Sequence, residues 1–521
     1  MPQIFQLPIL ILLLNLILFP ALISSEILKP GKDSDAYEYL NQLRQKAGMI
    51  SFKKSPVLEQ SAKNHSNYIS SNQVIGHLEN KSHSKFTGVT PENRALATGY
   101  ESRSVTENFS AGQKNAYESI DGLMSAIYHR KAFLDFSKDE IGIGIQKGKQ
   151  GFNYVYNMGN ERLNHFCQYS IYLNEGLFYP NVCKHNDKVS VEKYDQRKKE
   201  VQMQNPPFVL WPPSNSSFVP AVFYEEIPDP LPDRVVSGYP ISIHFNPYYF
   251  RYLRIQKFQL FRVKDNQEIK PIRILTAKSD KNKIFSKYDF ALFPLERLGW
   301  NTAYRAEIHI KANGKHLFES WQFKTRKLPY PLFIINASKN LLLLKPNQKY
   351  AIYIPPQKHA PYITNLHWES TEDIQTDISW EDKNTILAKL SGKKCQTVHF
   401  SLNSNRSFML QIADKDNLNP THYYPADTGS KCILQTMRDI PGFRIKGAGE
   451  LLKLESNQDY WIEILPHNNV ISQIKWQDSK QMNISVSHLN HNTLKIRVSG
   501  LPGDRSTFFI SKSKSFNIVI K

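Results

Sequence analysis

Cysteine is scarce in this chain. The 521 residues include only four, Cys167, Cys183, Cys395 and Cys432. No two of them have the spacing of a zinc knuckle or of a CxxC redox motif, which excludes both kinds of site. An even number of cysteines in an exported chain permits disulfides, and three pairings are open. Of these three, we expect the pairing between sequence neighbours, Cys167–Cys183 and Cys395–Cys432.

Long apolar runs are missing after the first 25 residues, where no segment reaches the roughly 20 apolar residues of a membrane-spanning helix. The N-terminus differs, because Leu7 to Leu22 is apolar and is followed by Ser24 and Ser25. This pattern predicts a secretory signal peptide over residues 1–25, although no Lys or Arg precedes the apolar core. An uncleaved membrane anchor is the alternative. We therefore expect a secreted, periplasmic or cell-surface protein with no transmembrane span once the signal is removed.

Acidic side chains are too few to balance the basic ones, because 47 Asp and Glu face 66 Lys and Arg, for a net charge of +19. Natural partners of an exported cation are an anionic envelope component, a lipid headgroup, a lipopolysaccharide or an acidic glycan. Nucleic acid is the rival polyanion, but no nucleic-acid-binding motif is present, so we expect none. A surface merely solvated by lysine is the plainer interpretation.

Residue spacing gives the N-terminal part of the chain a mixed pattern. Apolar periodicity predicts three helices and two strands, over residues 35–47, 55–69, 112–129, 141–146 and 152–158. His65 falls on the apolar face of the second helix, where we interpret it as a core histidine with one hydrogen bond.

Six short motifs follow one another in this region. They are Gly76-His77-Leu78-Glu79, Thr90-Pro91-Glu92-Asn93-Arg94, Gly99-Tyr100, Thr106-Glu107-Asn108, Tyr128-His129-Arg130 and Ile141-Gly142-Ile143-Gly144. In order and spacing they resemble the motifs of the CAP superfamily, also called the sperm-coating-protein or cysteine-rich-secretory-protein family, in its bacterial form. The resemblance covers residues 35–160 and implies an α-β-α sandwich.

The same resemblance implies a functional site. His77 and His129 take the positions of the family's two motif histidines, and Glu107 takes that of its glutamate. Two imidazoles and one carboxylate can bind a divalent metal such as zinc, with water completing the shell. We expect the three side chains to meet in one open cleft. Structural roles are implied for three further residues, Arg94, Tyr100 and Asn108.

Two departures from the family pattern bear on this site. Thr106 replaces the usual glycine of the turn before Glu107, and Ala126 stands where many eukaryotic members carry a second acid. Three interpretations stay open: a cleft that binds a metal or another ligand, a structural hydrogen-bonded cluster, and a catalytic site. The missing acid, and the lack of a recognisable serine or cysteine nucleophile motif, favour a non-enzymatic binder.

A change of pattern follows the CAP-like region. Residues 161–235 are predicted to be a linker. This segment is polar at first and then rich in proline from Asn205 to Pro232. Strand alternation and the hairpin signal Asn313-Gly314 predict a sandwich over residues 236–328, which resembles bacterial immunoglobulin-like domains.

The last two hundred residues contain an internal repeat with a period of roughly 110 residues. Tyr350 matches Tyr460, and Trp368 matches Trp476. Short strands separated by Asn, Gly and Pro predict two small β-sandwiches, over residues 330–428 and 436–521. We interpret both tryptophans as core residues.

Together these features predict an α+β multidomain chain, with a CAP-type α-β-α sandwich followed by three all-β immunoglobulin-like sandwiches. The expected function is that of an exported, non-enzymatic binder of a small apolar, lipid-like or sterol-like ligand, a divalent metal or an envelope component. The β modules would space or attach it. One alternative is a metal-assisted envelope hydrolase, of peptidase or esterase type, that uses His77, Glu107 and His129. The other is an adhesin that acts through the β modules.

Overall fold

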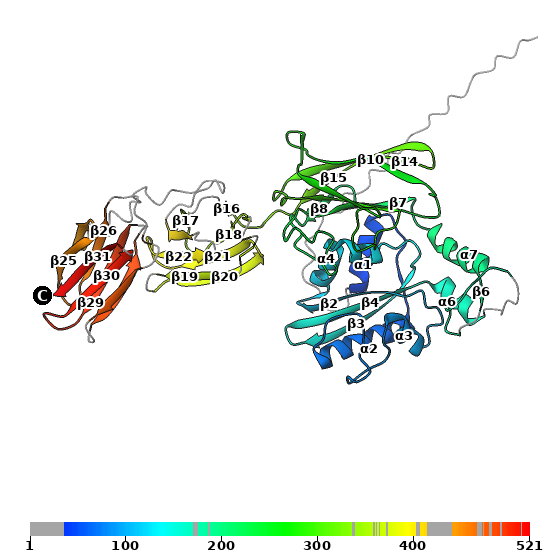
Figure 1. Ribbon diagram of the computed structural model, residues 1–521, viewed down its shortest axis with the longest axis horizontal. Helices are drawn as coiled ribbons and strands as arrows, with labels where there is room; N and C mark the ends of the chain where they lie inside the picture. The colour runs from blue at the N-terminus through cyan, green and yellow to red at the C-terminus, as the bar shows by residue number, and fades with distance from the viewer. Residues whose placement is uncertain are drawn as a thin grey trace, which may run out of the picture. The chain divides into compact units, whose positions relative to one another are not determined.

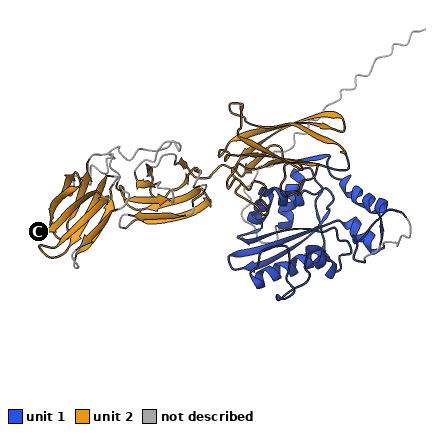
Figure 2. Cartoon of the chain, viewed as in Figure 1, with its two compact units in different colours: residues 1–209, 246–249 blue, residues 210–245, 250–521 orange. Residues whose placement is uncertain are grey.

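The computed structural model describes residues 36–521 except for short gaps. The gaps are residues 170–175, 186–187, 336–338, 358–359, 361, 364, 371–372, 403–406, 414–439, 466–470, 472–473, 479–481, 490–491 and 512. The predicted signal peptide and Cys432 lie outside the described residues. The chain divides into two compact units, Met1–Val209 with Asn246–Tyr249, and Leu210–Phe245 with Phe250–Lys521 (Figure 2). Within the described residues, no helix combines the length and apolar character that a bilayer crossing requires.

The N-terminal unit is built from helices around one sheet. Its helices are α1 (Ala36–Lys46), α2 (Pro56–Asn72), α3 (Pro91–Ala97), α4 (Ala116–Ser125), α5 (Ile127–Phe133), α6 (Glu161–Gln168) and α7 (Val191–Gln202). The sheet has the order β1-β3-β4-β2, with β1 (Lys53–Lys54), β2 (Thr106–Gln113), β3 (Glu140–Gly148) and β4 (Gly151–Gly159). A small ladder joins β5 (Phe178–Tyr179) to β6 (Val189–Ser190). Helices α2 and α3 lie on one face of the sheet, and α1 and α4 lie on the other (Figure 1).

Two glycines of β3 determine how closely α2 approaches the sheet. A Cβ on Gly142 would come within 1.9 Å of the backbone nitrogen of Glu59, and one on Gly144 within 2.2 Å of the backbone of Ala62. No side chain fits at either position, so the helix backbone rests directly on the strand. The motif Ile141-Gly142-Ile143-Gly144 therefore places α2, and with it the loop that follows α2.

The single helix expected over residues 112–129 is wrong. Strand β2 continues to Gln113, and α4 begins after Asn115, whose side chain accepts a hydrogen bond from the backbone of Glu118 at 2.9 Å. Ala126 has an extended backbone, with φ −76° and ψ 119°, and separates α4 from α5. The apolar stripe runs through this break without interruption, so periodicity could not reveal it. His129 therefore lies inside α5 instead of ending a long helix.

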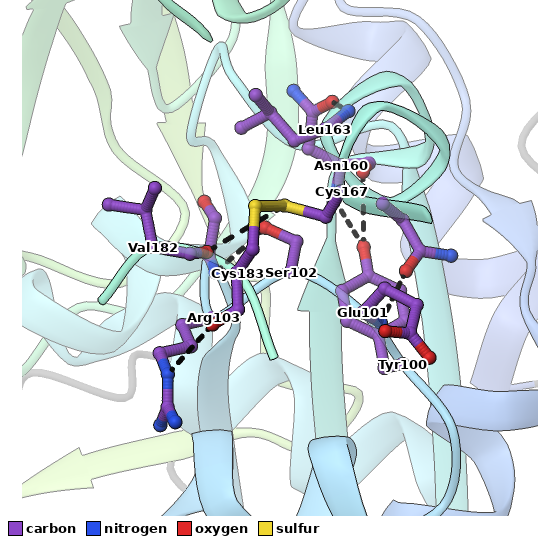
Figure 3. The surroundings of a disulfide bond; sticks show 11 residues. Tyr100, Glu101, Ser102, Arg103, Asn160, Leu163, Cys167, Val182 and Cys183 are labelled. Carbon is purple, nitrogen blue, oxygen red and sulfur yellow. Dashed lines mark hydrogen bonds between the residues drawn. A yellow bond between two sulfur atoms is a disulfide. The ribbon is translucent and has the colours of Figure 1, made fainter. Parts of the chain in front are cut away.

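Residues 161–235 are more than a linker, because they contain α6, α7 and several strands. The disulfide Cys167–Cys183 joins α6 to the loop that follows β5, as expected from sequence. Ser102 forms an isolated bridge with Cys183, and Arg103 Nε donates to the carbonyl of Cys183 at 3.2 Å (Figure 3). The polar composition of this segment concealed two amphipathic helices that pack on each other.

The first β module consists of two sheets. A five-stranded sheet has the order β11-β10-β14-β15-β8, and a four-stranded sheet has the order β12-β13-β9-β7. The strands are β7 (Phe208–Trp211), β8 (Ser216–Val219), β9 (Ile241–Phe245), β10 (Leu253–Arg262), β11 (Gln267–Glu268), β12 (Ile272–Thr276), β13 (Asp289–Pro294), β14 (Ala303–Ala312) and β15 (Lys315–Thr325). Along β14 buried and partly exposed residues alternate, which leaves one face of this sheet to solvent.

Two further pairs of sheets follow, and they share one topology. The first pair has the orders β16-β18-β21-β20 and β17-β23-β22-β19, and the second has β24-β26-β29-β28 and β25-β31-β30-β27. The first pair contains β16 (Leu332–Ile334), β17 (Lys339–Leu344), β18 (Lys349–Tyr353), β19 (Leu366–Ser370), β20 (Gln375–Asp382), β21 (Thr385–Ser391), β22 (Thr397–Leu402) and β23 (Ser407–Ile412). The second contains β24 (Gly442–Ile445), β25 (Ala448–Leu454), β26 (Asp459–Ile464), β27 (Lys475–Asp478), β28 (Asn483–His488), β29 (Thr493–Ser499), β30 (Arg505–Ser511) and β31 (Lys514–Ile520). The predicted fold class, a CAP-type sandwich followed by a long β-rich region of several sheets, is confirmed.

The interpretation of Trp368 and Trp476 as core residues is wrong. They are 41% and 40% exposed, and each sits on the edge strand of its sheet. One face of each indole covers a buried phenylalanine, Phe400 at 6.2 Å and Phe508 at 5.8 Å between ring centroids. In both copies the tryptophan is half-exposed and packs over a buried phenylalanine. A match between two aromatic residues in sequence does not show whether they are buried or half-exposed. Cys395 is disulfide-bonded, but the predicted pair Cys395–Cys432 lies outside the described residues.

Candidate functional site

An ion pair between α3 and β2 forms the centre of the candidate site. Glu107 is the second residue of β2, and its neighbour Thr106 pairs with Met158 of β4, so the expected turn is a strand. Arg94 on α3 donates from Nη2 to both carboxylate oxygens of Glu107, at 2.8 and 2.7 Å. The side chain of Arg94 is 0% exposed and that of Glu107 is 1% exposed. A buried acid is not what we expected of an open cleft, so that part of the prediction is wrong.

His77 lies directly above this pair, in the loop after α2. Its Nδ1 is 3.0 Å from Glu107 Oε1, and its ring stands edge-on to Phe109 with 5.0 Å between centroids. Arg94 Nη1 donates to the backbone carbonyl of His77 at 2.9 Å. The preceding Gly76 has φ +144°, a conformation that favours glycine. The side chain of His77 is 41% exposed and that of Glu107 is 1% exposed. The loop therefore holds an imidazole that is open to solvent on one side and hydrogen-bonded to a buried carboxylate on the other.

A second buried carboxylate lies beneath the loop. His65 Nδ1 is 2.9 Å from Glu79 Oε1, and His65 Nε2 is 3.0 Å from the carbonyl of Gly76. Both ring nitrogens therefore face acceptors, where sequence analysis expected one hydrogen bond. Glu79 also accepts from the backbone nitrogen of Thr87 at 2.7 Å. Glu79 belongs to the same motif as His77, but its histidine partner is His65.

The surroundings of Glu107 keep it ionised. Burial raises its pKa, but the hydrogen bond from His77 and the charges of Arg94 and His65 outweigh that cost, and the net effect lowers the pKa. With its side-chain amide turned to satisfy its neighbours, Asn157 also donates to Glu107 Oε2 at 3.0 Å. Donors thus surround both oxygens, and the carboxylate can orient His77 but has little room for a further ligand.

The backbone of His129 is hydrogen-bonded to the strand that carries Glu107. The side chain of Asn108, the residue after Glu107, donates to the carbonyl of His129 at 2.9 Å and is 2% exposed. Residue His129 itself is half-buried on α5. In the described part of the chain, no three His, Cys, Asp or Glu side chains come together in a way suited to holding a metal ion.

Tyr100 stabilises one end of the sheet and does not contact His77 or Glu107 in any described hydrogen bond. Its ring is buried, and its hydroxyl lies 2.6 Å from Glu140 Oε1 and accepts from the backbone nitrogen of Asn160 at 2.9 Å (Figure 3). Burial, followed by the charge of Glu140, raises the pKa of Tyr100 well above its usual value. The hydroxyl therefore remains a fixed hydrogen-bonding group that joins the end of β4 to the start of β3.

The fold places helices on both faces of one four-stranded sheet, with a buried Arg–Glu–His arrangement between α3, β2 and the loop after α2. Residues 37–166 match the sequence profile of CAP, the cysteine-rich secretory protein family, and this part of the chain is a CAP domain. No curated protein matches the sequence significantly.

Solved structures offer distant likenesses. One is an extracellular protein with an SCP domain from Bacillus anthracis, 18% identical, with 25% of this chain and 40% of that one covered and a TM-score of 0.22. Another is an outer surface protein of Borrelia burgdorferi, 20% identical, with 24% of this chain and 90% of that one covered and a TM-score of 0.22. The chain thus spans less than half the length of the first of these.

Proposed function

We propose that this is an exported binding protein whose CAP domain takes up a ligand at His77, and that its β modules space or attach this domain. The observation that carries the proposal is the contact between the exposed imidazole of His77 and the buried, ionised Glu107. A hydrogen bond from Nδ1 to a fixed carboxylate holds the ring in one orientation and leaves Nε2 for a ligand.

A divalent metal such as zinc is one ligand that an oriented imidazole can bind, and water would have to complete its shell, because no three His, Cys, Asp or Glu side chains of the described residues form a metal cluster. Histidine ligands of zinc commonly bond a carboxylate through their other ring nitrogen, which raises their basicity and fixes the ring. In this arrangement His77 and His129 would hold the metal, and Glu107 would orient His77 from below. A bound metal would add a Lewis-acidic centre at the surface of the domain.

The loop around His77 also supports an apolar ligand. Ile75 and Leu78 flank His77 in sequence and are 77% and 65% exposed. Large apolar side chains at this exposure, beside an oriented polar group, are typical of a contact surface for a ligand or partner. The ligand would place an apolar body on Ile75 and Leu78 and a polar or metal-bound end at His77.

Export is supported by the described disulfide. Cys167–Cys183 requires an oxidising compartment to persist, such as the periplasm or the cell exterior. The names of the two structural relatives, an extracellular protein and an outer surface protein, point in the same direction.

Zinc titration by calorimetry tests the metal. We expect the full chain to bind about one zinc ion, and the double variant His77→Ala/His129→Ala to lose this binding. His165→Ala, which removes an exposed histidine from α6, serves as the matched control. Equal binding by all three proteins, or none by the wild type, would reject the metal.

Apolar binding is tested separately with a fluorescent fatty-acid probe. We expect Ile75→Ser/Leu78→Ser to weaken probe binding, while Leu177→Ser, at an 83% exposed leucine of the same unit, leaves it unchanged. Probe binding that is insensitive to both variants would place the apolar ligand elsewhere.

The rival function is a metal-assisted hydrolase, favoured by the same His77–Glu107 contact, because an oriented imidazole can act as a general base. Peptide, ester and peptidoglycan substrates with and without zinc decide between the two. Turnover that disappears in Glu107→Gln, while zinc binding persists, would establish the hydrolase.

A further inference from the structure

The first β module contains a hollow lined largely by cations. Its volume is about 540 Å³, and four of its seven lining residues are basic, with no acid among them. The lining residues are Arg251, Tyr252, Leu253, Arg254, Lys287, Lys311 and Gly314. The hollow lies at the end of the five-stranded sheet where β10 begins and the β14–β15 hairpin turns.

The backbone around the hollow is held rigidly. Asn313, in the hairpin turn, accepts from the backbone nitrogens of Arg251 and Tyr252 at 2.8 and 3.2 Å, and its own nitrogen donates to the carbonyl of Tyr252 at 2.8 Å. Arg254 and Lys311 are direct partners across the β10–β14 ladder and so lie on one face of the sheet. These contacts fix the backbone positions from which Arg251, Arg254 and Lys311 extend.

The four cations have no anionic partner within the described residues, although other arginines of the same module do. Arg262 pairs with Asp265, Arg273 with Asp233, and Arg305 with Glu307. In contrast, no carboxylate of the described chain lies within ion-pair distance of Arg251, Arg254, Lys287 or Lys311. Like charges held close together repel one another, and an anion bound among them would relieve that cost.

We propose that this hollow is a binding site for an anionic polysaccharide, whose carboxylate or sulfate groups contact Arg251, Arg254, Lys287 and Lys311. Guanidinium groups match the planar or tetrahedral oxygens of such groups, and two lysines add charge without demanding one geometry. Tyr252, 76% exposed, provides an aromatic surface against which the face of a sugar ring packs.

Two observations favour a glycan over the other polyanions. The disulfide Cys167–Cys183 supports an oxidising compartment, outside the cytosol where nucleic acid is abundant. The cations line a hollow, whereas a flat anionic membrane is met best by a protruding surface. This site lies outside the CAP domain and is independent of the function proposed for His77.

The test measures binding of the full-length protein to dextran sulfate, to alginate and to neutral dextran at low salt. We expect both charged glycans to bind and neutral dextran not to bind. Replacing the four cations with glutamine, in Arg251→Gln/Arg254→Gln/Lys287→Gln/Lys311→Gln, should weaken binding by roughly tenfold, because each exposed contact adds little alone. Binding should also fall as salt rises, since these charges are screened.

A matched control removes the same charge from the same module. Lys264, Lys278, Lys324 and Lys327 are exposed, and their replacement by glutamine should change glycan affinity less than twofold. An equal loss in both quadruple variants would show that net charge alone is responsible and would overturn the site. Unchanged binding in the first variant would also overturn it.

Two further measurements keep the outcome unambiguous. The smaller variant Arg254→Gln/Lys311→Gln, with an unaltered tryptophan emission spectrum, should show an intermediate loss, which excludes misfolding as the cause. Vesicles of phosphatidylglycerol and a DNA duplex are tested with the same variants. A loss confined to vesicles or to DNA, with glycan binding intact, would reject the glycan in favour of that polyanion.

Discussion

Nη2 of Arg94 lies between the two carboxylate oxygens of Glu107, 2.8 and 2.7 Å away, and water has almost no access to either side chain. This contact connects α3 to β2 and supports the loop that carries His77. The same guanidinium also lies 3.7 Å, through Nε, from Glu79. One arginine therefore offsets the charge of two buried acids.

Removing that arginine should strongly destabilise the N-terminal unit. Arg94→Met leaves two buried carboxylates without their cation, for which a loss of about 3–5 kcal/mol is typical. All described helices lie between Ala36 and Gln202, so circular dichroism at 222 nm during urea unfolding follows this unit. Arg197→Met, at a half-exposed pair with Glu200, is the control and should cost less than about 1 kcal/mol. A similar small loss for Arg94→Met would show that the network is not structural.

The acid stability of the unit should depend on Glu107. Because its pKa is lowered by folding from the reference value of 4.5, its contribution is complete above that pH and is lost as pH falls through the lower folded value. Glu107→Gln should therefore cost roughly 3 kcal/mol at pH 7. The gap to the wild type should narrow only below pH 4.5.

Urea unfolding at a series of pH values measures this gap. Glu192→Gln, at an exposed position in the first turn of α7, should show no comparable dependence. A gap that stays constant from pH 7 to pH 3 would contradict the assignment of Glu107 as a buried carboxylate.

Because α2 packs directly on β3, adding one methyl group at Gly142 should lower the stability of the unit substantially. Gly142→Ala forces the helix backbone away from the strand, and overpacking of this kind costs about 1–3 kcal/mol or more. Because the loop of His77 follows α2, zinc or probe binding should weaken in the same variant. Gly122→Ala is the control: its Cβ would meet nothing within 4 Å, and alanine favours the helix α4 by about 0.5–1 kcal/mol. Equal stability of the two variants in thermal melts would refute the close contact.

Loss of the disulfide should destabilise the unit by about 3 kcal/mol, the amount expected for a loop of this length, since the two cysteines are 16 residues apart. The double variant Cys167→Ser/Cys183→Ser tests this by thermal melting at 222 nm. Reduction of the wild type should lower the melting temperature of this helical unit, but reduction of the variant, which leaves only the disulfide of Cys395 in the β region to break, should leave the melting of this unit unchanged. A melting temperature equal to that of the wild type would show that the bridge carries no stability.

Sequence patterns located the components of the site better than their arrangement. The motif order identified His77, Glu107 and Arg94, because each belongs to one of the short motifs that resemble the family pattern. The pairing of His65 with Glu79 was not visible, since a histidine on an apolar helix face has no marked partner in sequence. The break at Ala126 was hidden for a related reason, because an apolar stripe reports which face is buried and not whether the backbone is continuous.

In the β region, periodicity and the repeat predicted the sheets but not how exposed individual side chains are. Trp368 and Trp476 align because each lies on the edge strand of the equivalent sheet in its copy. A pattern of alternating apolar residues predicts that an aromatic residue on the inner face is buried, even when it lies at an edge. The hollow beside Asn313 was invisible for another reason. Its cations come from β10, the segment just before it, β14 and a separate loop, and only folding brings them together.

The strand order of the repeats has a mechanical consequence. In each copy a strand near the beginning runs parallel to the copy's last strand, β17 beside β23 and β25 beside β31. A force that pulls the two ends of such a copy apart shears these two strands along their length. All the hydrogen bonds between them then resist the force at the same time. The two copies are thereby suited to carry tension along the chain.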